Sequence, residues 1–217
     1  MDRILAYDDW SDRTPREYLI KGKIVKMSPP EPLLPHTMSS ANLYKLFADY
    51  LQNSTCMVMP DRTYLRLSKI SNEALDKYLD ENYRLKKKVE NIVPDMMVVC
   101  NREYIRISGV CGPPDLVAEV LSASTEREDR YFKKRIYELL GVKEYWLVNY
   151  KSKTVEVFLL KDGKYQDGLT YHTYSEDEKS MMYAQELTEI LEDIPVSIFP
   201  DLVIKPEDIF VNTDLPD

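Results

Sequence analysis

The chain has 217 residues, a formal net charge of −8, 44% hydrophobic residues and 30% charged residues. This length and balance exclude the fibrous and intrinsically disordered classes and are typical of a single domain with a substantial core. The acidic balance argues against binding nucleic acid over the whole surface, but it leaves room for a local basic groove.

Targeting segments and cysteine motifs are missing from the sequence. The residues up to Trp10 contain no apolar stretch long enough for a signal peptide, and no run approaches the length of a membrane span. We therefore expect a cytoplasmic protein without membrane contact. Because Cys56, Cys100 and Cys111 show no C-x-x-C spacing, we expect buried free thiols and neither a disulfide framework nor a zinc site.

The first elements alternate between strands and helices. Residues 17–28 alternate apolar and polar side chains around Gly22 and predict a β-hairpin. A proline-rich connector leads to residues 36–51, whose apolar spacing predicts an amphipathic helix. Residues 55–59 and 63–67 predict a second strand pair, and the polar segment 69–88 predicts an exposed helical insertion.

The later elements predict a mixed α/β fold. Residues 92–99 and 115–121 are apolar strands that carry acids. Hydroxyl residues 122–125 and Gly141 mark the two ends of a helix over 126–140, and strands follow at 144–149 and 154–160. We expect one domain over 1–217, with the hairpin 17–28, a core over 36–160 and a C-terminal extension over 161–217.

Asp95 and Glu119 stand in apolar strands, where an ionised carboxylate is costly to bury unless it is paired or binds a metal. If the two strands are neighbours, the carboxylates can converge, and hard oxygen ligands suit Mg²⁺ or Mn²⁺. Two alternatives stay open. Asp95 could cap a turn after Pro94, and Glu119 could belong to a buried ion pair.

Asp129, Lys133 and Tyr137 recur at four-residue intervals on the predicted helix and therefore share one stripe. A lysine that reached the two carboxylates could hold an attacking water, help to deprotonate it or stabilise a pentavalent phosphorus. A surface ion pair between Lys133 and Asp129 is the structural alternative.

Four segments together resemble the Uma-type restriction endonuclease family of the PD-(D/E)xK nuclease superfamily. They are Val93–Asp95, Gly112–Ser122, Asp129-x-x-x-Lys133-x-x-x-Tyr137 and Gly141–Val148. The likeness extends to Glu17–Lys23 near the start and to Phe199–Leu202 near the end, so it covers nearly the whole chain.

The resemblance implies a restriction-endonuclease-like α/β (α+β) core, with a central mixed β-sheet flanked by helices and a divalent metal at its carboxylates. Asp95 matches the first acid of the superfamily and Glu119 the second. The usual lysine would fall at Leu121, so the resemblance points instead to Lys133 on the following helix.

Two further residues match the family pattern. Glu17 matches a glutamate of the opening hairpin and His36 a histidine at the first core helix, and either could complete the metal shell or orient a water. A structural role for His36 is the alternative. Lys23 departs from the pattern, because family members often carry an acid there.

The resemblance therefore implies a Mg²⁺- or Mn²⁺-dependent endonuclease that acts on DNA, with a homodimer as one arrangement for cutting both strands. The competing hypothesis is a non-catalytic binding or assembly module with the same fold, which would act through protein–protein contacts. Its support is the acidic net charge and the apolar segments 158–160 and 194–196, which we expect at the surface.

Overall fold

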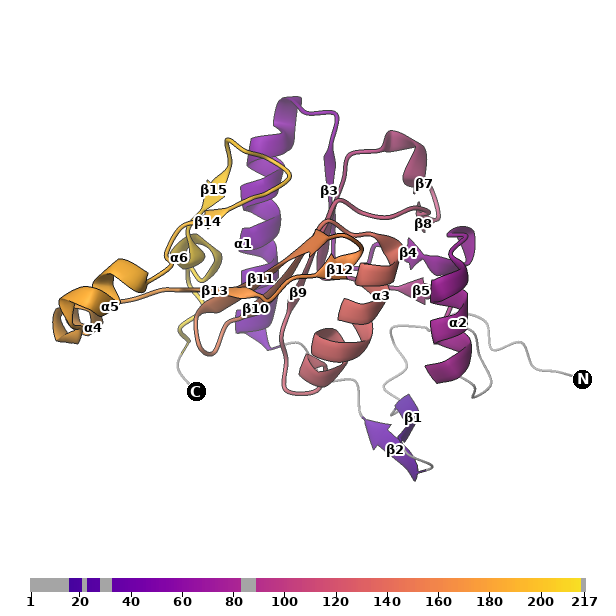
Figure 1. Ribbon diagram of the computed structural model, residues 1–217, viewed down its shortest axis with the longest axis horizontal. Helices are drawn as coiled ribbons and strands as arrows, with labels where there is room; N and C mark the ends of the chain where they lie inside the picture. The colour runs from indigo at the N-terminus through magenta and orange to yellow at the C-terminus, as the bar shows by residue number, and fades with distance from the viewer. Residues whose placement is uncertain (1–15, 21–22, 28–32, 83–88, 216–217) are drawn as a thin grey trace, which may run out of the picture. The chain divides into compact units, whose positions relative to one another are not determined.

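The computed structural model describes residues 16–20, 23–27, 33–82 and 89–215, and it describes side chains from residue 33 onward (Figure 1). The chain divides at Pro32 into two units. In the first unit, β1 (Arg16–Ile20) and β2 (Lys23–Met27) form an antiparallel hairpin in which Glu17 pairs with Lys26. The predicted hairpin is therefore confirmed, whereas the side chain of Glu17 lies outside the described residues.

The second unit is built on a seven-stranded mixed sheet. The strands run in the order β12-β11-β10-β9-β6-β3, and β13 also pairs with β11. All neighbours are antiparallel except β9 and β10, which are parallel. The bounds are β3 (Met57–Pro60), β6 (Met96–Val99), β9 (Leu116–Val120), β10 (Glu144–Asn149), β11 (Thr154–Lys161), β12 (Lys164–Tyr165) and β13 (Leu169–His172).

Helices cover both faces of this sheet (Figure 1). The helix α1 (Leu34–Tyr50) packs Leu43 and Phe47 onto the face that carries Met96 and Val98. The helix α3 (Lys134–Leu140) covers the opposite face, which carries Met97, Val99 and Val117. Because successive strand residues point to opposite faces, two covered faces explain why all of β6 is buried. The predicted mixed sheet flanked by helices is confirmed.

The predicted helix over 126–140 is present, but its middle is not α-helical. Residues Glu128–Lys133 form a π-helical turn, η4, in which hydrogen bonds reach five residues along the chain. The α-helical part α3 then ends at Gly141, whose φ of 82° lies in the left-handed region that favours glycine. Periodicity alone did not predict the π-helical turn.

One predicted strand pairing is wrong. The strand β4 (Leu65–Arg66) does not pair with β3; it joins a separate four-stranded sheet of order β5-β4-β8-β7. The other strands there are β5 (Asn91–Ile92), β7 (Ile105–Arg106) and β8 (Gly109–Val110). The turn residues at 60–62 suggested a local hairpin, but the buried partner of β3 is the distant strand β6. The helix α2 (Glu73–Asn82) confirms a helix within the predicted insertion, but it is not simply exposed, because Leu75 and Leu79 are buried in the core.

The C-terminal part adds short elements around α1 and the sheet edge. They are α4 (Glu176–Met181), α5 (Ala184–Glu189), β14 (Ile194–Pro195), β15 (Val203–Ile204) and α6 (Pro206–Ile209). The described residues also form three short 3-10 turns, which are η1 (Leu51–Asn53), η2 (Leu67–Lys69) and η3 (Arg102–Tyr104). None of the helices in the described ranges is long and apolar enough to cross a membrane.

The expectation about surface segments holds only in part, and the one about thiols is wrong. Phe158, Ile194 and Val196 are buried in the core, whereas Leu159, 40% exposed, and Pro195 reach the surface. Cys56 and Cys100 form a disulfide. They stand opposite each other one pair beyond Met57 and Val99 in the β3–β6 register, a nonlocal pairing that cysteine spacing along the sequence could not reveal. Cys111 is a free thiol, as expected, but it is only half-buried.

Candidate functional site

Asp95 and Glu119 stand opposite each other at one end of the sheet. The antiparallel register of β6 and β9 pairs Met96 with Ala118, and the next pair in the same register is Asp95 with Glu119. Glu119 points to the face covered by α3, where its carboxylate contacts Tyr137 and Lys133, whereas the Asp95 carboxylate lies near His36 of α1 at the strand end. Asp95 occupies a bend just before β6 and is not inside the strand. The strands β6 and β9 are neighbours, as the site prediction required, but Asp95 lies just outside the strand in which it was expected.

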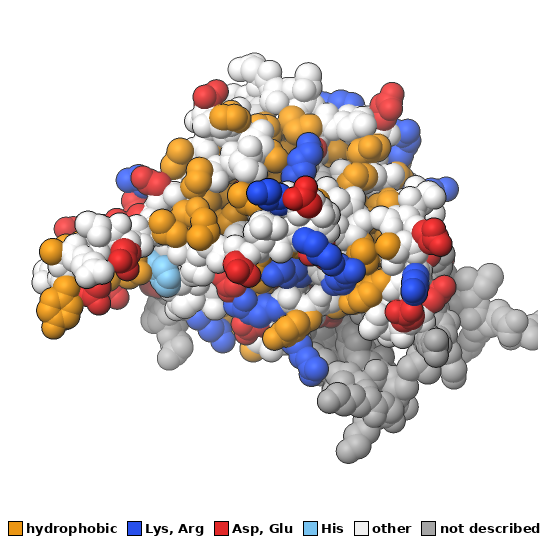
Figure 2. All heavy atoms as spheres, in the orientation of Figure 1, with side chains coloured by type: hydrophobic (Ala, Val, Ile, Leu, Met, Phe, Trp, Pro, Cys, Tyr) orange, Lys and Arg blue, Asp and Glu red, His pale blue; other side chains and the backbone are white. Residues whose placement is uncertain are grey.

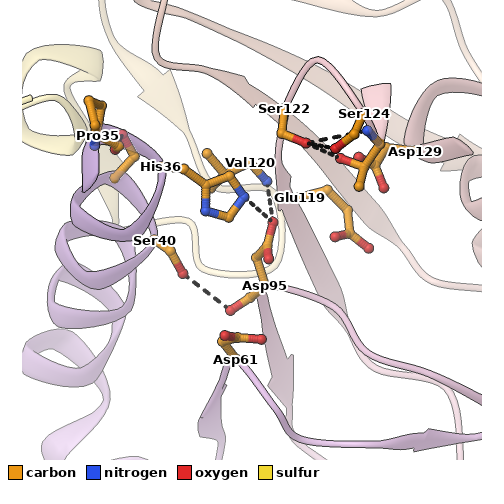
Figure 3. A network of polar contacts seen from close by, with 12 residues as sticks. Pro35, His36, Ser40, Asp61, Asp95, Glu119, Val120, Ser122, Ser124 and Asp129 are labelled. Carbon is orange, nitrogen blue, oxygen red and sulfur yellow. Dashed lines mark hydrogen bonds and ion pairs between the residues drawn. The ribbon is translucent and has the colours of Figure 1, made fainter. Parts of the chain in front are cut away.

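The Asp95 carboxylate is held by the backbone and approached by a histidine (Figure 3). Its Oδ2 accepts a hydrogen bond of 2.6 Å from the backbone N–H of Val120. The Nε2 of His36, in the first turns of α1, lies 3.6 Å from the same oxygen. Burial raises the pKa of Asp95 above its ordinary value, although His36 and Lys133 oppose the shift. The structure therefore places His36 beside Asp95.

The Glu119 carboxylate is more deeply enclosed, with only 1% of its side chain exposed. The Tyr137 hydroxyl donates a hydrogen bond of 2.6 Å to Oε1, and the Lys133 ammonium lies 3.0 Å from Oε2. Burial raises the pKa of Glu119 well above its ordinary value, the Lys133 charge opposes this, and the charges of Asp129 and Asp95 add to it. Each oxygen of Glu119 therefore has a defined partner on the helix.

Lys133 stands between two buried acids. Its Nζ lies 3.0 Å from Glu119 and 2.8 Å from Oδ1 of Asp129, and 15% of its side chain is exposed. Burial alone would lower the pKa of Lys133, but the charges of Glu119 and Asp129 outweigh burial and raise it above the ordinary value. Lys133 is therefore a cation at neutral pH, which argues against a neutral amine that removes a proton from water.

The predicted stripe of Asp129, Lys133 and Tyr137 faces the sheet, as the three contacts show. Leu121, where the family resemblance would place a lysine, is buried in the apolar cluster under α3. An ammonium placed at that position would lie among apolar side chains. The helix therefore supplies the cation that the strand does not.

The cluster has an excess of negative charge that a divalent cation would offset. Asp95, Glu119 and Asp129 face one ammonium and the imidazole of His36. Although Oδ1 of Asp129 lies close to Lys133, it accepts no well-aligned hydrogen bond. Mg²⁺ is commonly bound by one or two carboxylates, with water and substrate phosphate completing its shell. Asp95 and Glu119 therefore fit a divalent metal by donor type and charge.

No group of three or more acidic, histidine or cysteine side chains within the described ranges forms a complete metal-binding cluster. The two carboxylates would thus need oxygen ligands from water or substrate. Asp61, which the sequence reasoning treated only as a turn residue, stands opposite Asp95 one pair beyond Pro60 and Met96 (Figure 3). The signal that could have revealed it is a Pro-Asp pair directly after an apolar strand.

The second Pro-Asp pair of the central segment has a different role. Asp115 lies at the other end of β9, where Oδ2 accepts a hydrogen bond of 2.8 Å from the backbone N–H of Cys100. Its Oδ1 lies 2.7 Å from Nζ of Lys143. Asp115 therefore ties strand ends together away from the candidate site.

Comparisons with known proteins give consistent results. Residues 4–188 match the model of the Uma2 family, which is described as "Putative restriction endonuclease". The chain is also similar to a crystal structure of a "putative nuclease belonging to DUF820" from Anabaena variabilis, with 17% sequence identity, a TM-score of 0.55 and 90% of each chain covered. That likeness shows the fold. No curated protein matches the chain.

Proposed function

Because the chain belongs to the Uma2 restriction endonuclease family, we propose that it is a divalent-metal-dependent endonuclease that hydrolyses phosphodiester bonds of DNA. One observation carries the proposal: Asp95 directly precedes β6 at the end where Glu119 lies on the neighbouring strand β9, and a lysine from the covering helix contacts Glu119. Acidic oxygens beside a fixed cation are the groups that phosphodiester hydrolysis needs.

Asp95 and Glu119 would hold Mg²⁺ or Mn²⁺, with His36 beside Asp95 as a candidate to complete the shell or orient a water. When bound, such a metal lowers the pKa of a coordinated water and offsets charge on the phosphate. Glu17 stays a proposed supporting residue from the family resemblance alone.

The roles of the helix residues follow from their contacts. Lys133 is a preorganised cation that can stabilise negative charge as it develops on the scissile phosphate. Asp129 holds the Lys133 ammonium from one side, and Tyr137 fixes the orientation of Glu119 by its hydrogen bond. Besides their contact with each other, Lys133 and Glu119 therefore each have a further partner, Asp129 for the ammonium and Tyr137 for the carboxylate.

DNA as the substrate is supported by the family. Figure 2 shows Lys and Arg side chains interspersed with acids over the face that carries α3. Arg130 and Lys164 already pair with Glu156 and Glu138, so this face is not a bare basic patch. A phosphate that bound there would have to replace the carboxylates that already pair with these cations. We therefore expect a modest affinity for DNA that falls steeply as the salt concentration rises.

A homodimer belongs to this proposal, because one site per chain would need two copies to cut both strands of a duplex. Sedimentation of the purified protein with and without duplex DNA tests that part. A monomer in both conditions that still cuts both strands would remove it.

Cleavage of supercoiled plasmid and labelled duplex in Mg²⁺ or Mn²⁺ tests the function itself. We expect nicked and linear products that disappear with EDTA and with Glu119→Gln. Absence of cleavage for DNA and RNA, together with no calorimetric metal binding, would instead favour the non-catalytic binding module.

A further inference from the structure

Tyr145 makes a contact with the helix that the proposed chemistry does not use. It lies on β10, its side chain is fully buried, and its hydroxyl donates a hydrogen bond of 3.0 Å to the backbone carbonyl of Asp129. That carbonyl belongs to the π-helical turn Glu128–Lys133, where it also accepts from the backbone N–H of Lys134. In a regular α-helix the same carbonyl would accept from the N–H of Lys133.

The contact links the helix to the strands that carry the site. β10 lies beside β9, with Tyr145 opposite Val117 and Leu147 opposite Glu119. Asp129 is also the residue whose side chain lies 2.8 Å from Lys133. The Tyr145 hydroxyl thus ties the backbone of Asp129 to the strand next to the one that carries Glu119. Lys133 makes a second link between the same helix and Glu119.

The Tyr145 ring is held firmly enough to place its hydroxyl. It packs against Tyr137 at 5.2 Å between ring centroids, against Tyr165 at 6.0 Å and against Phe158 at 6.2 Å. A buried ring enclosed on several sides has little freedom to redirect its hydroxyl. π-helical turns are rare and occur often at functional sites, so a specific side-chain donor to this one is informative.

We propose that Tyr145 is a positioning residue, whose hydroxyl holds the π-helical turn in the conformation that keeps the Lys133 ammonium between Asp129 and Glu119. The role of Lys133 in cleavage rests on the proposed function, whereas the placement of its ammonium does not. Loss of the hydroxyl would let the turn shift toward α-helical hydrogen bonding and loosen the Lys133 contacts.

Lysine acetylation followed by mass spectrometry tests the placement without any nuclease assay. A buried, ion-paired ammonium reacts slowly, so we expect Tyr145→Phe to raise the labelling rate of Lys133 severalfold, up to about tenfold, for the loss of one buried hydrogen bond. Lys143, whose side chain is 65% exposed, serves as the internal reference and should not change.

Tyr165→Phe is the matched control. Tyr165 belongs to the same aromatic cluster, and its hydroxyl also donates to a backbone carbonyl, that of Val142 at 3.0 Å, beyond the other end of the helix. We expect this variant to leave Lys133 labelling at the wild-type rate. In cleavage assays, Tyr145→Phe should lower kcat and leave KM unchanged, and Tyr165→Phe should change neither.

Three results separate the ideas. Unchanged Lys133 labelling in Tyr145→Phe, or an equal rise at Lys133 and Lys143, would overturn the positioning role. A selective rise in Lys133 labelling in Tyr145→Phe, together with no cleavage of nucleic acid by the wild-type protein, would support the positioning role and remove the proposed nuclease function. If Tyr145→Phe does not fold, amide exchange in the wild-type protein decides: the proposal requires the Lys134 amide to be as protected as the amides of residues 135–140, and exchange at the rate of an exposed amide would overturn it.

Discussion

The ammonium of Lys133 lies 3.0 Å from Oε2 of Glu119, although one residue comes from a helix and the other from the neighbouring strand. This contact replaces the one that a lysine at position 121 would make from the strand. It also sets the physical character of the site, because the lysine is buried between two acids and stays charged. The following predictions depend on it.

Replacing Lys133 should separate cleavage from metal binding. Lys133→Met removes the cation that stabilises the reacting phosphate, and we expect cleavage to fall by about 10²–10³-fold. The same change frees Oε2 of Glu119 and removes a charge that repels a divalent cation, so calorimetry should show tighter Mn²⁺ binding. Lys134→Met is the control, because Nζ of Lys134 lies over the Phe158 ring and the acids that act on it are Glu156, Glu138 and Asp167, none of which belongs to the site. Weaker Mn²⁺ binding in Lys133→Met would contradict the account.

The Pro-Asp pairs at Asp95 and Asp115 should differ in function, although we expect both aspartates to contribute similarly to stability. Asp95→Ala and Asp115→Ala each remove the acceptor for one backbone N–H, and we expect each to cost about 1–2 kcal/mol in the free energy of unfolding. Only Asp95→Ala should abolish metal-dependent cleavage. Denaturant unfolding and plasmid cleavage of the two variants check this. Loss of cleavage in both would mean that the loss comes from lower stability and not from a role of Asp95 in cleavage.

Removing the Tyr137 hydroxyl should shift the pH dependence. Burial raises the pKa of Glu119, and the hydrogen bond from Tyr137 opposes that shift. Tyr137→Phe should therefore raise the pKa of Glu119 further, so that protons compete with the metal up to a higher pH. We expect the acid limb of Mn²⁺ binding, measured by calorimetry across a pH series, to move upward. A downward shift would argue against Glu119 as a metal ligand.

Glu144 should make stability depend on pH in a way that is independent of the site. Its oxygens accept hydrogen bonds from Trp146 and Ser197, but burial raises its pKa above the ordinary value. The folded state then binds more protons than the unfolded state between the ordinary and the raised pKa. The stabilising contribution is fully present below the ordinary carboxylate pKa and is lost as the pH rises through the raised one.

Comparison with Glu144→Gln isolates this effect, because glutamine does not titrate. In denaturant unfolding at several pH values from about 4 to about 8, the stability of the wild-type protein relative to the variant should fall as the pH rises. A constant difference, or a rise with pH, would contradict the raised pKa.

Much of the fold could be predicted because the signals were local. Gly141 and the hydroxyl residues before Glu126 marked the helix ends, and apolar runs marked β6, β9 and β10. The pairing of β3 with β6 instead of β4 could not be predicted, because two apolar strands carry no local mark of their partner. The Cys56–Cys100 disulfide was missed for the same reason.

At the site, the strand alternation and the helical stripe predicted which acids and which lysine face each other. Periodicity could not predict the π-helical turn. An apolar pattern does not show that the Tyr145 hydroxyl on the sheet donates to the backbone carbonyl of Asp129. Tyr145 was therefore missed: its side chain looked like one more aromatic residue of a buried strand.

Anomalous diffraction from crystals soaked in Mn²⁺ tests the central claim most directly, because it locates the metal without relying on activity. We expect a single strong peak between the carboxylates of Asp95 and Glu119, with the Lys133 ammonium still beside Asp129, and no peak there in crystals of Glu119→Gln. No peak at these carboxylates in the wild-type protein, under conditions in which other surface acids bind the metal, would contradict the account.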